Sequence, residues 1–298
     1  MKRPVLHTIA VFIFLMLLLP FTSLARDIEP IVSTDWLQQH ASDPKLVIVD
    51  IRKVEEFKTG HIPNAVNVVY GSFAIMKAGL RNEMPHADDL SDVLSSAGIG
   101  ADSHVVVVGN ADTVPNRTDI SRVAITLRYA GVTNVAILDG GYGKWLAEKK
   151  PVATDIVKPK PVKHDIKANE AMFVKKDYVL GAIGKVTMID TREPEFYEGK
   201  KKMDFVAKPG RIKGAVNLPP SQAYTKDGTF KTRAELAALV AKAAGSDPAK
   251  EIILYCDTGK VCSSWGYVMT ELLGYKNVRI YDGSTEEWMK DPKAPAEP

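Results

Sequence analysis

The chain has 298 residues, of which 45% are hydrophobic and 25% are charged, with 39 basic and 36 acidic side chains. This composition is typical of a globular protein long enough for two domains of ordinary size, and it excludes a chain that is disordered along most of its length. The small net charge of +3 gives no indication of a nucleic-acid partner.

The first 25 residues have the pattern of a cleavable secretory signal. Lys2 and Arg3 precede an apolar run that ends near Pro20, and Ser23 and Ala25 form the small-x-small arrangement that a signal peptidase requires. The apolar run is shorter than the ~20 residues that span a bilayer, so we expect export with cleavage after Ala25. Cleavage leaves 37 basic against 36 acidic side chains. We therefore expect a periplasmic or secreted protein with no membrane contact after cleavage.

The rest of the chain repeats itself. The segment LVIVDIRKVEEFKTGHIPNAVNV, residues 46–68, returns as VTMIDTREPEFYEG and GRIKGAVNLP, with the insertion KKKMDFVAKP between these two parts. Residues 104–146 and 251–289 form a second matching pair in the same order. Self-similarity of this kind predicts a tandem duplication.

The two copies are separated by the segment TDIVKPKPVKHD. Its alternating Pro and Lys residues favour an extended, solvated linker over a helix or a central strand. We therefore predict an N-terminal domain at 26–154, a linker at 155–163 and a C-terminal domain at 164–298.

Each copy is predicted to be an α/β domain. The apolar runs LVIVD, VVVVG and VAILDG, and their counterparts VTMID, IILYC and VRIYDG, are short and β-branched, which suits buried parallel strands. Helical patterns alternate with them; Thr232 and Glu235 form a capping box at the start of one helix, and Gly245 ends it. This alternation predicts a mostly parallel sheet flanked by helices on both faces in each domain.

The chain's two cysteines, Cys256 and Cys262, lie in the stretch LYCDTGKVCSSWGY. In an exported protein two cysteines are read by default as a disulfide. However, Cys256 ends a predicted strand, and a helical pattern starts just beyond it. The positive end of that helix, backbone N–H groups and a tight turn at Gly259 would stabilise a thiolate, and Lys260 adds a positive charge nearby.

Four signatures, CDTGKV after a strand, DTREPEFYEG, GRIKGAVNLP and YDG with a following EW, have counterparts in the same order in the N-terminal copy. Together they resemble the rhodanese family of sulfurtransferases in its tandem two-domain form. The resemblance implies two tandem rhodanese-like domains, with the nucleophile in the C-terminal copy. The N-terminal copy, where Asn110 stands in the place of the cysteine, is expected to be inactive.

The resemblance implies an enzyme of the thiosulfate or 3-mercaptopyruvate sulfurtransferase type. The Cys256 thiolate would take sulfur from a small anionic donor and pass it, as a persulfide, to a thiol, to cyanide or to a protein acceptor. No metal or organic cofactor is expected, and the histidines show no metal-ligand spacing.

The predicted site consists of Cys256 as the nucleophile, an active-site loop and three cations. The loop residues are Asp257, Thr258, Gly259, Lys260, Val261 and Cys262. The candidate cations for the donor are Arg211, Lys213 and Arg192. Many tandem family members have an arginine four residues after the position of Arg192, whereas this chain has Phe196. Arg192 also has a structural interpretation, because the N-terminal copy keeps the same pair as Asp50 and Arg52.

Two other functions stay open at this level. Cys256 and Cys262 could act as a thiol–disulfide redox pair, although five intervening residues match no Cys-x-x-Cys motif. The protein could also be a non-catalytic sulfur-carrier module. A phosphatase is excluded, because Cys262 occupies the position of the arginine that such enzymes need to bind phosphate.

Overall fold

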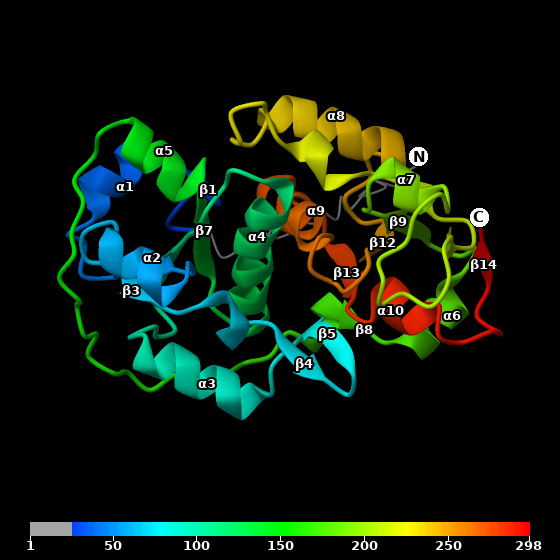
Figure 1. Ribbon diagram of the computed structural model, residues 1–298, viewed down its shortest axis with the longest axis horizontal. Coiled ribbons are helices and arrows are strands. Elements are labelled where there is room, and N and C mark those ends of the chain that lie inside the picture. The colour runs from blue at the N-terminus through cyan, green and yellow to red at the C-terminus, as the bar shows by residue number, and fades with distance from the viewer. Residues whose placement is uncertain (1–25) are drawn as a thin grey trace, which may run out of the picture.

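The computed structural model describes residues 26–298 and consists of two α/β domains that lie side by side (Figure 1). This confirms the predicted fold class. The predicted signal segment at 1–25 lies outside the described residues. Between residues 26 and 298, no helix has both the length and the apolar character needed to cross a membrane.

The N-terminal domain is built on a parallel five-stranded sheet in the order β1-β7-β6-β2-β3. Its strands are β1 (Ile31–Val32), β2 (Leu46–Asp50), β3 (Val66–Asn67), β6 (His104–Val108) and β7 (Asn134–Leu138). Its helices are α1 (Thr34–His40), α2 (Val54–Thr59), α3 (Ala87–Ser96), α4 (Val114–Tyr129) and α5 (Gly141–Ala147). Apolar residues of α3 and α4 pack on one face of the sheet, and those of α1, α2 and α5 pack on the other.

The C-terminal domain repeats this arrangement with a parallel sheet in the order β11-β9-β12-β13-β8. Its strands are β8 (Phe173–Val174), β9 (Thr187–Asp190), β11 (Val216–Asn217), β12 (Glu251–Tyr255) and β13 (Asn277–Tyr281). Its helices are α6 (Lys176–Ala182), α7 (Pro194–Tyr197), α8 (Arg233–Ala244), α9 (Ser263–Tyr267) and α10 (Ser284–Trp288). Strand by strand, the two sheets have the same order, as expected for a duplication.

The capping box predicted from the sequence is confirmed at the start of α8. The Thr232 hydroxyl accepts a hydrogen bond from the Glu235 N–H, and the Glu235 carboxylate accepts one from the Thr232 N–H. Gly245 ends the helix with a φ of 86°. Local signals therefore define this helix at both ends.

Two pairs of strands lie outside the main sheets. The hairpin β4–β5 (Ile75–Lys77 and Leu80–Glu83) reaches from the N-terminal domain toward α10 of the C-terminal domain (Figure 1). In the C-terminal domain, β10 (Arg211–Ile212) pairs with β14 (Ala296–Glu297). The hairpin thus places N-terminal residues beside the C-terminal copy.

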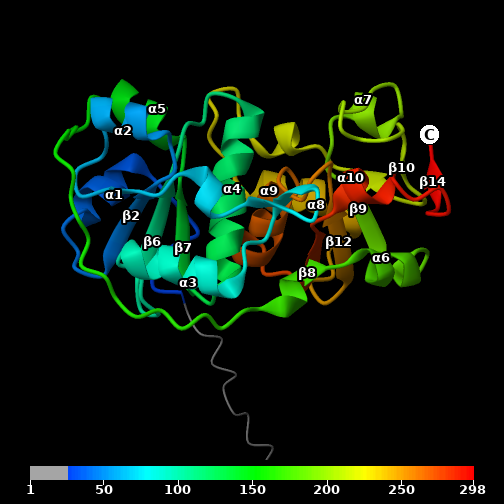
Figure 2. The same ribbon diagram turned by 60° about the horizontal axis from the view of Figure 1, so that its bottom comes forward.

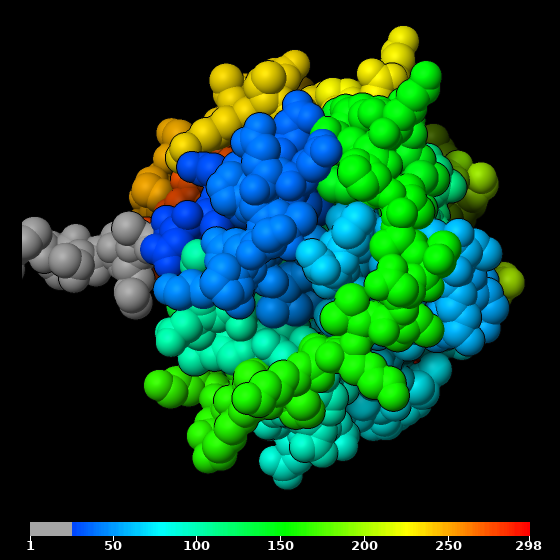
Figure 3. Space-filling model, turned by 90° about the vertical axis from the view of Figure 1, so that its left-hand side faces the viewer, coloured from blue at the N-terminus to red at the C-terminus, as the bar shows by residue number. Residues whose placement is uncertain are grey.

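The segment that joins the two copies crosses the surface of the N-terminal domain, where it is the green band in Figure 3. Ala153 forms an isolated bridge with His61, and the Val162 N–H donates to the Ser95 carbonyl. His164 is buried and its ring nitrogens contact the carbonyls of Ile99 and Ala130. Backbone contacts therefore hold the connection against the first domain.

The two domains share a core between α4 and α9, which lie against each other in both views (Figures 1 and 2). Arg122 projects from α4 and is fully buried. Its Nη1 donates to Asp282 Oδ1 at 2.6 Å and to the Gly259 carbonyl at 3.3 Å, and its Nη2 donates to Asp282 Oδ2 at 3.0 Å. A charge from the first domain therefore has its carboxylate partner in the second.

We predict that Arg122→Met lowers the free energy of unfolding of the full chain by about 3–5 kcal/mol, because it leaves Asp282 buried without its partner. Urea unfolding measures the change. Arg128→Met is the matched control, since its partner Glu271 keeps a second arginine, Arg26, and its loss should cost about 1 kcal/mol or less. Equal losses in both variants would contradict the role given to Arg122.

Candidate active site

Cys256 directly follows β12, at the carboxyl edge of the C-terminal sheet, and is fully buried. The Ser284 hydroxyl accepts hydrogen bonds from the Cys256 N–H at 3.1 Å and from the Gly259 N–H at 2.9 Å. The Thr285 N–H donates to the Cys256 carbonyl at 3.1 Å. The start of α10 therefore holds the chain just before the loop, at Cys256, and at Gly259 within it.

Gly259 is the turn of this loop, and no other residue fits there. Its φ is 71°, a value that side chains disfavour, and a Cβ atom would lie 2.1 Å from Asp282 Oδ1. Its carbonyl accepts a hydrogen bond from Arg122 of the N-terminal domain, and the Cys262 sulfur lies 3.1 Å from the same oxygen. A second cross-domain contact joins Asn82 Nδ2 to Thr258 Oγ1 at 2.8 Å. The N-terminal domain thus fixes the shape of the loop.

The environment of Cys256 favours its thiolate. Burial raises the pKa of this thiol, but hydrogen bonds from the Cys262 thiol and from the backbone N–H groups of Thr258 and Cys262 outweigh it, although the Asp257 charge opposes them. The resulting pKa is lowered to about 7. Both cysteines are free. Burial and the neighbouring Cys256 raise the pKa of Cys262, which stays a neutral hydrogen-bond donor.

A cavity of about 390 Å³ borders this loop. N-terminal, C-terminal and loop residues all line it: Arg81, Asn82, Val114, Pro115, Arg192, Glu193, Phe196, Met203, Phe205, Pro220, Asp257, Thr258, Lys260 and Val261. The insertion KKKMDFVAKP contributes two of these residues, Met203 and Phe205. The cavity is therefore shared between the domains, and most of its wall is apolar.

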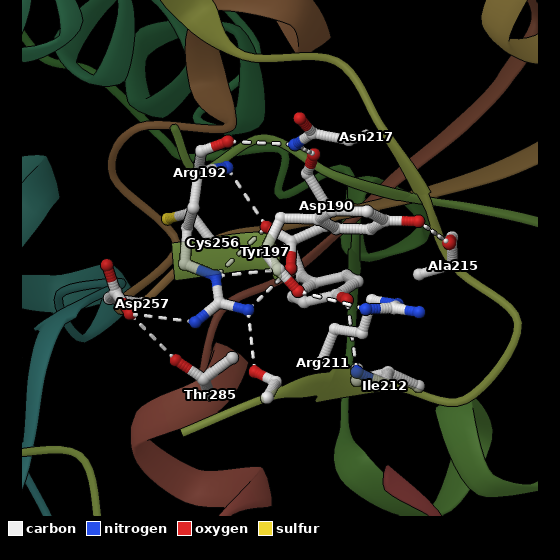
Figure 4. A network of polar contacts seen from close by, with 12 residues as sticks. Asp190, Arg192, Tyr197, Arg211, Ile212, Ala215, Asn217, Cys256, Asp257 and Thr285 are labelled. Atoms are coloured by element: carbon white, nitrogen blue, oxygen red, sulfur yellow. Dashed lines mark hydrogen bonds and ion pairs between the residues drawn. The ribbon is translucent and has the colours of Figure 1, made fainter. Parts of the chain in front are cut away.

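Arg192 lies between two carboxylates beside Cys256 (Figure 4). Its Nε and Nη2 bind Asp190 at 2.6–3.1 Å, and Nη2 also donates to the Gly210 carbonyl at 2.8 Å. Arg52 makes the same contacts with Asp50 and the Gly60 carbonyl in the N-terminal copy. This repeated clamp supports the structural interpretation. Arg192 also lines the cavity, and its Nη1 lies 3.6 Å from Asp257 Oδ1.

The structure places the other predicted cations in different surroundings. Lys260 forms an ion pair with Asp119 of α4, with 2.8 Å between Nζ and Oδ1. Arg211 pairs with Glu297 at 3.1 Å and stacks over the Tyr197 ring. Lys213 is exposed, and its N–H donates to the Pro295 carbonyl. Neither Arg211 nor Lys213 lines the cavity.

The position of Cys256 in the N-terminal copy is taken by Gly109, so the expectation for Asn110 is wrong by one residue. In the N-terminal sheet Asp50 pairs with Val108, and in the C-terminal sheet Asp190 pairs with Tyr255. Gly109 follows Val108 and Cys256 follows Tyr255, so these two residues occupy the same position. A Cβ atom at Gly109 would lie 2.9 Å from Ile120, which leaves no room for a nucleophile. Asn110 corresponds to Asp257, and the extra residues of its loop hid this register.

Three residues of the N-terminal domain contact the active-site region without having been predicted. Arg81 forms an ion pair with Glu286, Asn82 binds Thr258, and Arg122 binds Gly259. Only Arg122 carries a signal in the sequence, because it stands inside the mostly apolar run at 120–127 of α4. Within residues 26–298, no cluster of three or more His, Cys, Asp or Glu side chains could hold a metal ion.

Comparison with known proteins gives one family. The family model of the rhodanese-like domain matches residues 33–148 and 176–291. A protein of Mycolicibacterium smegmatis, provisionally named as a thiosulfate sulfurtransferase, is 34% identical over 90% of this chain and 98% of its own length. The "Sulfur carrier protein TtuD" of Thermus thermophilus is 30% identical over 87% of this chain and 93% of its own length.

A solved structure of EanB, in a persulfide form with ergothioneine, has the same fold. It superposes with a TM-score of 0.80 and covers 90% of this chain and 70% of its own. The sequence identity is 23%, so this likeness concerns the fold alone.

We predict that removing the Cys262 hydrogen bond raises the pKa of Cys256. In the parent protein the thiolate fraction should rise with pH around a midpoint of about 7. In Cys262→Ala the midpoint should move to higher pH, because the Cys256 thiolate loses a hydrogen-bond donor. In Cys262→Ser the hydroxyl can still donate, so the midpoint should stay near that of the parent. The rate of alkylation of Cys256 against pH measures this. An unchanged midpoint in Cys262→Ala would show that Cys262 does not stabilise the Cys256 thiolate.

Proposed function

Because the chain belongs to the rhodanese family, with one rhodanese-like domain in each half, we propose that it transfers sulfane sulfur through a persulfide on Cys256. The observation that supports this most directly is the buried Cys256 thiol at the carboxyl end of β12, in a loop that Ser284 holds at Cys256 and Gly259. Hydrogen bonds from Cys262 and from the N–H groups of Thr258 and Cys262 lower its pKa. An N–H cradle stabilises an anionic sulfur whether it is a thiolate or a persulfide. The same loop therefore serves both resting states of the reaction.

The proposed reaction has two steps. The Cys256 thiolate attacks the outer sulfur of the donor, the bond between that sulfur and the rest of the donor breaks, and the remainder leaves with the electron pair. The persulfide then gives its outer sulfur to a thiol or to cyanide, and the Cys256 thiolate returns. The reaction therefore needs no oxidant or reductant besides the donor and the acceptor.

The donor is proposed to be a small anion that enters through the cavity beside Asp257. Thiosulfate and 3-mercaptopyruvate follow from the resemblance, and the provisional name of the Mycolicibacterium smegmatis relative supports thiosulfate as the first donor to test. A protein acceptor is a further possibility for the second step, since one relative is named a sulfur carrier.

The redox alternative has less support from the site. It needs Cys262 as a second nucleophile, yet burial and the neighbouring Cys256 raise the pKa of this thiol. A non-catalytic sulfur carrier would use the same persulfide, and it would differ only in having no turnover with small donors. Turnover with cyanide as acceptor separates this alternative from an enzyme.

We also propose that the protein is exported and that cleavage follows Ala25. The pattern of the first 25 residues supports this proposal. The intact mass of the protein from a periplasmic fraction tests it, because the mature chain should begin at Arg26.

We predict that Cys256→Ser abolishes formation of thiocyanate from cyanide and of the persulfide, because a hydroxyl cannot hold the transferred sulfur as the thiolate does. The free energy of unfolding should stay within about 1 kcal/mol of the parent, since the two side chains have nearly the same size. Intact mass after incubation with the donor, and urea unfolding, give the two readings. Sulfur transfer that survives in Cys256→Ser would remove Cys256 as the nucleophile.

Lys213→Ala tests the donor contact expected from the sequence. Because Lys213 is exposed and does not line the cavity, we predict an unchanged donor KM in this variant. A raised KM with unchanged kcat would return Lys213 to the donor site.

A further inference from the structure

The walls of the cavity beside Cys256 favour a donor with an apolar body. Val114 and Pro115 come from the start of α4, Phe196 from α7, and Met203 and Phe205 from the insertion. Thiosulfate has no apolar part and would leave this surface uncovered. An organic group on the donor would bury it and gain the free energy of removing apolar area from water.

The three cations that line the cavity already have carboxylate partners. Arg81 pairs with Glu286, Arg192 with Asp190, and Lys260 with Asp119. A dianion that entered would have to compete with these carboxylates for each cation. The cavity therefore offers little net positive charge to a doubly charged donor.

Asp257 adds a negative charge to the cavity wall. It directly follows Cys256, and its Oδ1 accepts a hydrogen bond from the Thr285 hydroxyl at 2.9 Å. The same oxygen lies 3.6 Å from Arg192 Nη1, which is buried and has no hydrogen-bond partner among residues 26–298. Two carboxylates, Asp190 and Asp257, thus flank a single guanidinium, and the group of three has a net charge of about −1 when both are ionised.

We propose that the site selects singly charged sulfane-sulfur donors with an apolar body over dianionic thiosulfate, and that Asp257 makes this selection. The inference rests on the proposed sulfur transfer at Cys256. Arg192 Nη1, which has no hydrogen-bond partner in the part of the chain that the structure describes, can donate to a single negative charge, while Asp257 repels a second one. Asp257 is thereby a specificity-determining residue.

The step on such a donor is balanced without a further reactant. For a thiosulfonate, R–SO₂–S⁻, the Cys256 thiolate attacks the terminal sulfur, the S–S bond breaks, and the sulfinate R–SO₂⁻ leaves with the electron pair. Cys256 keeps one added sulfur as a persulfide anion. An organic persulfide, R–S–S⁻, would react in the same way and release the thiolate R–S⁻.

The test compares kcat/KM for three donors: thiosulfate, methanethiosulfonate and benzenethiosulfonate, with cyanide as acceptor and the full chain as enzyme. We expect benzenethiosulfonate to be the best donor and thiosulfate the poorest. Asp257→Asn should shift the ratio of thiosulfate to benzenethiosulfonate toward thiosulfate by about 10-fold, since the dianion gains more from the lost repulsion. Phe196→Ala should lower kcat/KM for benzenethiosulfonate more than for methanethiosulfonate.

Asp35→Asn is the matched control. It removes one carboxylate from α1, which lies at the far end of the N-terminal domain from α10 (Figure 1), where the Asp35 side chain is 79% exposed. In this variant the ratio of kcat/KM for thiosulfate to kcat/KM for benzenethiosulfonate should equal that of the parent.

The selection is refuted if thiosulfate is the best donor of the parent protein, or if Asp257→Asn leaves the donor ratio unchanged. The proposed function fails separately, and is recognised by intact mass, if none of the three donors adds a sulfur atom to Cys256 in the parent protein.

Discussion

The active-site loop depends on one guanidinium that is buried between the two domains. Arg122 of α4 binds both oxygens of Asp282 and the carbonyl of Gly259, two groups that belong to the other copy. A buried charge is tolerated only when it is paired, so Arg122 and Asp282 each require the other domain. The loop around Cys256 is therefore a product of both copies, although only one copy carries a cysteine.

This dependence gives a physical reason for keeping a copy that has no cysteine. In the N-terminal copy, Gly109 stands at the position of the nucleophile, and Ile120 fills the space that a side chain would need. The hairpin β4–β5 and the start of α4 instead contribute one wall of the cavity and a hydrogen bond from Asn82 to Thr258. The first domain thus supports the loop and forms part of the cavity wall.

The sequence was sufficient for features that short-range patterns determine. The duplication, the buried strands and the capping box at Thr232 follow from periodicity and local hydrogen bonding, and the position of Cys256 follows from its place at the end of a strand. The alignment of Asn110 with Cys256 was wrong, because the N-terminal loop contains extra residues and the sequence does not show where they are inserted. The strand pairing in the two sheets aligns Gly109 with Cys256 instead. The cross-domain contacts of Arg122 depend on how two copies pack, which no local pattern encodes. Charge alone suggested Arg211, whereas its partner Glu297 is distant in the sequence.

The central claim is that Cys256 carries sulfur in a loop whose shape both domains maintain. A crystal structure of the protein after reaction with a sulfane-sulfur donor tests it most directly. The account predicts one additional sulfur atom on Cys256 within reach of the Thr258 and Cys262 N–H groups, with the Arg122 contact to Gly259 retained. A disulfide between Cys256 and Cys262, or an unmodified Cys256 after the donor has been consumed, would contradict it.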